Sequence, residues 1–65
     1  MNKLDLHGVK HEDVDRLVEN FVLLNKPPLS IITGNSDKMR EIVEYVCNKH
    51  NIHCERWDWG EIKIL

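Results

Sequence analysis

The sequence predicts a two-layer α/β sandwich, an α+β fold in which two helices cover one face of a four-stranded mixed sheet. Three observations lead to this prediction. Some segments alternate apolar and polar residues as half-buried strands do, and others space their apolar residues as amphipathic helices do. The segments follow one another in the order βαβαββ, and every connection between them is short. A chain of 65 residues has room for one domain, which we place over residues 1–65.

The first strand is expected over residues 3–7, where Lys3-Leu4-Asp5-Leu6-His7 alternates and Gly8 ends the pattern. The first helix is expected from Glu12 onward. It stops before Pro27-Pro28, because the residue that precedes a proline is disfavoured in a helical conformation. Its predicted apolar stripe consists of Val14, Leu17, Val18, Phe21 and Leu24.

The second strand is expected over residues 29–33, followed by a tight turn at Gly34-Asn35-Ser36. Either Asn35 or Ser36 is a suitable N-cap for the second helix. The predicted stripe of that helix consists of Met39, Ile42, Val43, Val46 and Cys47. A third strand is expected over residues 52–57, and Asp58-Trp59-Gly60 turns the chain into a last strand over residues 61–65.

The predicted strands are one-sided, so one face of the sheet should be covered by the helices and the other open to water. The first two strands are joined through a helix and should be parallel, whereas the last two form a hairpin. The residues expected to face the helices are Leu4, Leu6, Ile52, Cys54, Ile62 and Ile64, and those expected on the open face are Asp5, His7, His53, Glu55, Glu61 and Lys63.

Composition narrows the possible environments and partners. The formal net charge is −2, which argues against a protein that binds nucleic acid by bulk charge, although a local basic patch is compatible with it. The sequence has no apolar run long enough to cross a membrane and no signal-peptide core at its start. We therefore expect a cytoplasmic protein with no membrane partner and with reduced cysteines.

The most suggestive polar residues follow the first two strands. In parallel β-α units the carboxyl ends of the strands and the N-termini of the helices meet at one rim, where ligands bind. The backbone N–H groups at Thr33, Gly34, Asn35 and Ser36 could receive a phosphate, with Lys38 and Arg40 adding positive charge. The alternative is structural: Gly34 supplies a turn and Ser36 an ordinary cap.

Asp5 and His7 are alternate residues of one predicted strand, so their side chains should share a face. A carboxylate and an imidazole together can bind a divalent cation or divide acid–base work on a phosphodiester. The alternative is a polar outer face that happens to contain both residues.

Leu4-Asp5-Leu6-His7-Gly8 resembles the LDLHG signature that opens Smr (small MutS-related) domains, and Ile31-Ile32-Thr33-Gly34 resembles the ITGxG segment of that family. The resemblance spans nearly the whole chain. It implies a βαβαββ fold that binds nucleic acid and nicks DNA or cleaves RNA. By position, Asp5 and His7 match the residues implicated in cleavage, and Thr33 and Gly34 match the phosphate-side turn.

The chain also departs from that pattern. Ser36 stands where the family has a second glycine, the loop before the second helix is shorter, and Gly60 alone remains of a glycine-rich stretch. A Cβ at Ser36 occupies space that a phosphate could otherwise approach, so binding should tolerate this change better than cleavage.

Two further groups of residues have the chemistry of a functional site. Cys47, His50, His53 and Cys54 include zinc-ligand types, but they lack the usual paired spacing and both cysteines fall on predicted inward faces, so no zinc site is expected. Trp57 and Trp59 flank Asp58 in the hairpin, where they could stack on unpaired bases, seal the core edge or contact a partner.

Two functions follow from these observations. The first is a nucleic-acid-binding domain with weak, metal-dependent endonuclease activity on DNA or RNA. In it His7 is the general base, Asp5 either orients His7 or holds Mg²⁺ or Mn²⁺, and no cofactor is tightly bound. The alternative is a non-catalytic protein-interaction module that uses the open sheet face or the Trp57/Trp59 hairpin. The oligomeric state is left open by the sequence.

Overall fold

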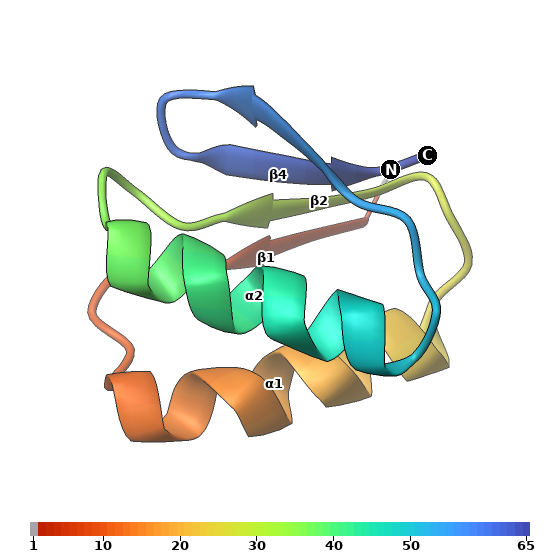
Figure 1. Cartoon of the computed structure of the whole chain (residues 1–65), viewed down its shortest axis with the longest axis horizontal. Helices are drawn as coiled ribbons and strands as arrows, with labels where there is room; N and C mark the ends of the chain where they lie inside the picture. Colours follow the sequence, from red (N-terminus) through yellow and green to blue (C-terminus); the bar gives the residue numbers. More distant parts are fainter. Residues whose placement is uncertain (1) are drawn as a thin grey trace.

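The computed structural model describes residues 2–65 and confirms the predicted fold class (Figure 1). Four strands and two helices follow one another in the order βαβαββ. They are β1 (Asn2–Asp5), α1 (His11–Leu24), β2 (Leu29–Ile32), α2 (Asp37–Lys49), β3 (Glu55–Asp58) and β4 (Glu61–Ile64).

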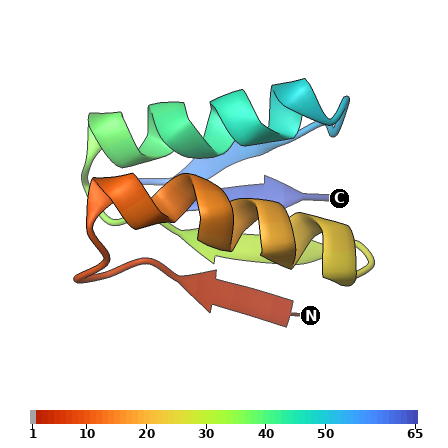
Figure 2. The same ribbon diagram turned by 90° about the horizontal axis from the view of Figure 1, so that it is seen from below.

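The strands form one mixed sheet in the order β1-β2-β4-β3. β1 pairs with β2 in parallel, and β4 pairs antiparallel with both β2 and β3, as expected from the helical crossover and the hairpin. Figure 2 shows both helices on the same side of the sheet. The other face is not covered by a helix.

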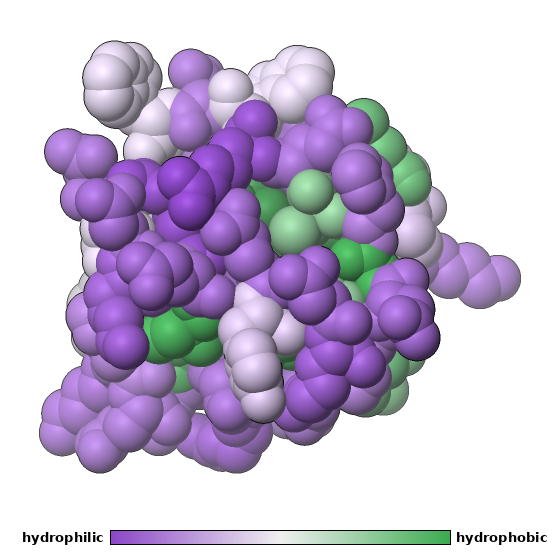
Figure 3. All heavy atoms as spheres, in the orientation of Figure 1, coloured by the Kyte–Doolittle hydropathy of each residue, from purple (hydrophilic) through white to green (hydrophobic). Residues whose placement is uncertain are grey.

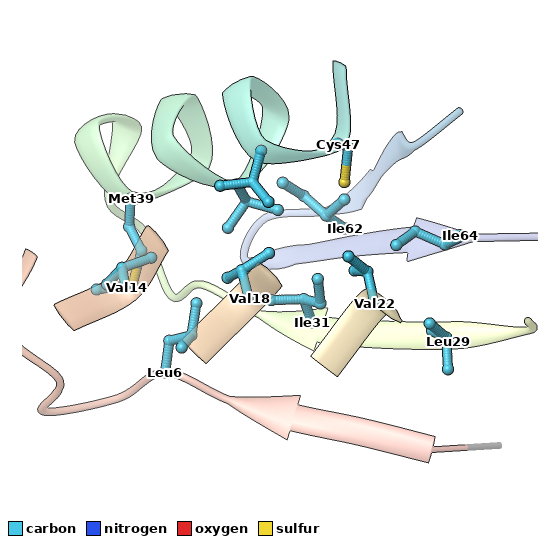
Figure 4. Packing of buried hydrophobic residues seen from close by; sticks show 12 residues of the cluster. Leu6, Val14, Val18, Val22, Leu29, Ile31, Met39, Cys47, Ile62 and Ile64 are labelled. Carbon is cyan, nitrogen blue, oxygen red and sulfur yellow. The ribbon is translucent and has the colours of Figure 1, made fainter. Parts of the chain in front are cut away.

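The core fills the space between the helices and the sheet (Figure 4). Ile31 in β2 and Ile62 in β4 are paired neighbours and fully buried at its centre. Of the predicted inward positions, Leu6, Ile62 and Ile64 are buried and Leu4 is half-buried. The first strand was expected over residues 3–7, but β1 ends at Asp5 because the Asp5 side chain accepts the His7 N–H and the chain turns there, so Leu6 and His7 lie beyond the strand. The buried cluster consists of Leu6, Val14, Val18, Val22, Leu29, Ile31, Met39, Val43, Val46, Cys47, Ile62 and Ile64.

One residue of the predicted α1 stripe was placed wrongly. Leu24 is 80% exposed, whereas Val22, which was not assigned to the stripe, is buried. Val14, Val18 and Val22 are spaced four residues apart and form one line along the helix. Leu24 is the last residue of α1 and lies off that line, so it does not reach the sheet.

The second helix is bounded by specific backbone interactions. Ser36 is its N-cap, with the side-chain oxygen accepting a hydrogen bond from the Met39 N–H at 3.1 Å. At the other end the chain turns at Asn51, which has φ 57°, and the Ile52 N–H donates to the Cys47 carbonyl at 2.8 Å.

That C-terminal cap explains why the third strand was predicted wrongly. Residues 52–54 were expected to start it, but β3 begins at Glu55 and continues to Asp58. Because the Ile52 N–H closes the end of α2, this segment is held against the helix instead of pairing with β4. Ile52 and Cys54 are half-buried and still pack on the core, which preserves the predicted alternation.

Three loops gather at one end of the sheet, on the left in Figure 1: β1 to α1, β2 to α2, and β3 to β4. The parallel pairing of β1 with β2 brings the first two loops together, and the antiparallel pairing of β4 brings the third. This end, which we call the loop rim, contains the sequence-predicted site residues.

A core substitution should test this packing. Ile31→Ala should lower the free energy of unfolding by about 2–5 kcal/mol, because it leaves a cavity where no side chain can move in. A domain of this size has about 3–10 kcal/mol in total, so the variant should be close to unfolded. Leu24→Ala is the control and should stay within about 0.5 kcal/mol. Equal urea midpoints for the two variants would contradict the assigned core.

Candidate functional site

Asp5 and His7 form a bonded pair at the loop rim. The Asp5 Oδ1 lies 2.7 Å from His7 Nδ1 and also accepts a hydrogen bond from the His7 backbone N–H at 3.0 Å. Both side chains are well exposed, at 62% for Asp5 and 67% for His7. The pair is therefore pre-formed, and solvent or a ligand can reach it.

Hydrogen bonding fixes the protonation pattern of this pair. The His7 backbone N–H, and then the His7 side chain, lower the pKa of Asp5, so its carboxylate stays ionised at neutral pH. An ionised carboxylate can only accept, so Nδ1 of His7 must donate. In a neutral imidazole this leaves a lone pair on Nε2, which is the atom a general base needs.

Gly34 lies directly beside the imidazole. A Cβ at this position would lie 3.2 Å from His7 Nε2, and the backbone has φ +66°, a conformation that other residues rarely adopt. Gly34 therefore permits both the turn after β2 and the close approach of His7. The structure thus brings Asp5, His7 and Gly34 together, as the sequence predicts.

Gly60 holds the third loop against this turn. Its carbonyl accepts hydrogen bonds from the Thr33 N–H at 2.8 Å and the Gly34 N–H at 3.2 Å. A Cβ on Gly60 would lie 2.9 Å from the Gly34 Cα, closer than real Cβ atoms come to backbone. Any side chain at position 60 would force the two turns apart.

The same contact changes how an anion could be bound here. Thr33 is buried, its hydroxyl donates to the Gly34 carbonyl at 3.0 Å, and the N–H groups of Thr33 and Gly34 are occupied by Gly60. In the first turn of α2 the Met39 N–H is bonded to the Ser36 side chain, which leaves the N–H groups of Asp37 and Lys38 as the helix-start donors. An anion at this end would therefore meet those two donors and not the N–H groups of Thr33 and Gly34.

The Arg40 side chain links the β2–α2 loop to the β3–β4 loop. Its Nη1 donates to the carbonyls of Gly34 at 3.1 Å and Trp59 at 2.9 Å, and its Nη2 bonds Asp37. Only 11% of its side chain is exposed. These bonds occupy the guanidinium that the sequence offered as a phosphate ligand.

Lys38 is exposed but belongs to a different depression. It lines a groove of about 390 Å³ between the two helices, together with His11, Glu12, Asp15, Glu41, Ile42 and Tyr45. Acidic side chains surround it there. Lys38 is nevertheless in the first turn of α2, within the region where an anion would meet the helix N-terminus.

The residues do not build a site for a resident metal ion. Within residues 2–65, no three His, Cys, Asp or Glu side chains come together to hold one. Asp5 has already committed one oxygen to His7. A single carboxylate is a poor donor set for Mg²⁺ unless a substrate phosphate brings further oxygens.

The cysteine and histidine cluster does not converge either. Burial raises the pKa of the Cys47 thiol to about 12, which opposes the thiolate that zinc requires. His50 Nε2 lies 2.7 Å from Glu19, and His53 Nε2 lies 3.3 Å from Glu55. Each histidine is thus paired with a carboxylate, while the Cys47 and Cys54 thiols contact each other.

Comparisons with protein-family models, with curated proteins and with solved structures found no match for this chain. In the part of the chain that the structure describes, no helix has the length and apolar character to cross a bilayer.

Sequence reasoning missed two features of the site. Gly60 was noted as the remnant of a glycine-rich stretch, but its contact with Gly34 depends on two loops that are distant in sequence. Arg40 was assigned to phosphate binding because it is cationic and near a helix start, and its bond to the Trp59 carbonyl has no local signal. In the sequence, only the Trp-Asp-Trp-Gly segment indicates that a turn lies there, and it does not indicate which residues that turn contacts.

Substitution of Gly60 should disturb the site from a distance. Gly60→Ala should cost about 1–3 kcal/mol, because the new Cβ meets backbone that cannot move away. Amide resonances of Thr33 and Gly34 and the ring resonances of His7 should shift with it. Gly8→Ala, where nothing lies within 4 Å but φ is +77°, should also cost about 1–2 kcal/mol through backbone strain. It should leave the Thr33 and Gly34 amides in place, and identical shift patterns for both variants would disprove the contact.

The Asp5–His7 pair can be tested by carboxyl titration. In the native chain the Asp5 pKa should lie below its ordinary value. In His7→Ala it should rise but remain lowered, because the larger cause, the backbone N–H of residue 7, is retained. A pKa lowered by folding means that the pair's stabilisation is present above the unfolded-state pKa and lost as pH falls through the folded value. An Asp5 pKa that is unchanged in His7→Ala would exclude the side-chain bond.

Proposed function

We propose that this chain is a nucleic-acid-binding domain of the Smr type, whose Asp5–His7 pair catalyses weak cleavage of phosphodiesters. One observation carries the proposal. An ionised carboxylate holds an exposed imidazole with Nε2 available, and the N-terminus of α2 lies at the same end of the sheet. An anion seat beside a general base is the minimum that phosphodiester cleavage requires.

In the proposed reaction, the first-turn N–H groups of α2 receive the phosphate, and Lys38 adds positive charge. His7 Nε2 removes a proton from the attacking water, or from a ribose hydroxyl in RNA. The attacking oxygen then bonds to phosphorus as the bond to the leaving sugar oxygen breaks. Asp5 holds the imidazole in the required tautomer and stabilises the imidazolium that forms.

A divalent cation is not assigned to a residue in this scheme. Asp5 has one oxygen that is not bonded to His7, and within residues 2–65 no three ligand-type side chains come together, so Mg²⁺ or Mn²⁺ would have to arrive with the phosphate. The cation would add charge stabilisation to the phosphate when bound. Cleavage rates with Mg²⁺, with Mn²⁺ and with a chelator therefore measure whether the reaction depends on a metal ion.

The resemblance to Smr domains supports the same conclusion. The two motif segments begin on adjacent parallel strands, and just beyond the strand ends His7 of the first lies beside Gly34 of the second. Ser36, the departure from the family pattern, has φ −118°, which any residue adopts. The second glycine is thus not required by the backbone here, and Ser36 contributes a cap instead. We also propose that the protein is located in the cytoplasm.

The open sheet face supports a protein-binding function less well. Ser30 donates to Glu61 across this face, and Lys63 covers the ring of Trp57 with its ammonium 4.4 Å from the ring centre. Ser30 is thus paired with Glu61, and Lys63 with Trp57, so these polar groups already have partners within the chain. Figure 3 views the molecule with the sheet edge-on, above the helices; on that side hydrophilic residues predominate and the hydrophobic patches are small and separate.

The decisive variant is His7→Ala. If the native chain nicks supercoiled plasmid or cleaves labelled RNA, with Mg²⁺, Mn²⁺ or a chelator present, His7→Ala should abolish cleavage. Binding should stay within a few-fold, because the phosphate seat is on α2. Asp5→Asn should reduce cleavage by about a hundredfold or more, since an amide can favour the wrong tautomer.

The matched control is His53→Ala. His53 is also exposed and also paired with a carboxylate two residues away, but it precedes β3, away from the loop rim. It should cleave as the native chain does. Ser36→Gly should change stability by only a few tenths of a kcal/mol and should raise activity if the Cβ obstructs the phosphate. Absence of cleavage in both the native chain and Ser36→Gly would disprove the nuclease activity, and cleavage retained in His7→Ala would exclude His7 as the base.

A further inference from the structure

Trp59 stands out among the apolar side chains of the loop rim. It is 84% exposed, more than Trp57 at 56%, and it occupies the turn between β3 and β4. A large aromatic ring held in water at a loop that borders a polar site is a typical nucleic-acid contact, because every base has a flat face on which it can stack.

The backbone beneath this ring is fixed. The Trp59 carbonyl accepts a hydrogen bond from Arg40 Nη1, which also binds the Gly34 carbonyl. The next residue, Gly60, is packed on Gly34 and accepts its N–H. A side chain on a rigid turn loses less conformational freedom on binding than one on a mobile loop.

The same contacts place Trp59 near the Asp5–His7 pair. Gly34 would bring a Cβ within 3.2 Å of His7 Nε2, and a Cβ on Gly60 would reach within 2.9 Å of the Gly34 Cα. Consecutive Cα atoms are about 3.8 Å apart, so the Trp59 Cα is within about 9 Å of the Gly34 Cα. A nucleotide whose phosphate meets the rim can therefore extend its base to the indole.

We propose that Trp59 is a base-stacking platform and that the preferred ligand is single-stranded or unpaired nucleic acid. The inference rests on the function proposed above and specifies its substrate class. Bases in a duplex are stacked on one another and do not offer a free face, whereas an unpaired base does. A stacked base beside a phosphate seat would hold the adjoining phosphodiester at His7.

Trp57 does not fit this role. Its ring already faces the Lys63 ammonium at 4.4 Å, and it lies within β3, at the irregularity between the Arg56–Ile62 and Asp58–Glu61 pairs, and not in the turn. The two tryptophans therefore give a matched pair, one as platform and one as control. They are the only two in the chain, so each can be observed alone.

The experiment uses Trp57→Phe, which leaves Trp59 as the only indole, and Trp59→Phe, which leaves Trp57. Fluorescence is recorded during titration with a thymidine oligonucleotide, a uridine oligonucleotide and a blunt DNA duplex. Either single-stranded probe should quench Trp59 in the Trp57→Phe protein. Quenching of Trp57 in the Trp59→Phe protein should be much smaller, and the duplex should bind more weakly than the single strands.

Affinity measured by anisotropy of labelled oligonucleotides completes the test. Trp59→Ala should weaken single-strand binding on the order of tenfold to a hundredfold, and Trp59→Phe should retain most of it, because phenylalanine also stacks. Trp57→Ala should bind as the native chain does. Unfolding curves of all variants should coincide, since both indoles are exposed.

The outcomes separate the two proposals. Single-strand binding that is unchanged in Trp59→Ala, or a preference for the duplex, would overturn the stacking platform and leave the proposed function intact. Absence of binding to every probe would overturn both.

Discussion

The contact between Gly60 and Gly34 is the constraint on which the loop rim depends. It brings the β3–β4 turn so close to the β2–α2 turn that a Cβ on Gly60 would lie 2.9 Å from the Gly34 Cα, whereas a Cβ on Gly34 would meet the His7 ring at 3.2 Å. One carbonyl, that of Gly60, accepts the N–H groups of both Thr33 and Gly34. His7 packs on the other side of Gly34, so the three loops are joined in one stack. The shape of the rim thus follows from the absence of two Cβ atoms.

Arg40 completes that arrangement electrostatically. Its side chain is largely buried, and Nη1 donates to the carbonyls of Gly34 and Trp59, which belong to two different turns. Asp37 balances its charge from the first turn of α2, where a negative residue also favours the helix. A buried cation whose donors are bonded within the protein holds the surrounding turns in place but attracts a ligand weakly. The positive potential available to a phosphate is accordingly that of the helix start and Lys38.

Much of this could be read from the sequence, because it depends on local periodicity. Local patterns predict the order of elements and the Ser36 cap, and the helical crossover predicts the parallel pairing of β1 with β2. The sequence also predicts that Asp5 and His7 lie together, but for a different reason from the one found: His7 lies beyond β1, where the Asp5 side chain bonds its backbone N–H and its ring. The failures have non-local causes. Residues 52–54 alternate like a strand, yet the C-terminus of α2 uses the Ile52 N–H first. Arg40 has the charge and place of a phosphate ligand, yet its partners lie on turns that only the folded sheet brings near.

We propose that a nucleic-acid strand binds at the loop rim and not at another surface. A two-dimensional amide and indole NMR titration of the native chain with a short single-stranded oligonucleotide tests this. We expect the largest shifts at His7, at Gly34, at the first turn of α2 and at the Trp59 indole, while Trp57 and the groove beside Tyr45 change little. Shifts concentrated on Trp57 and Lys63, or in the groove between the helices, would contradict it.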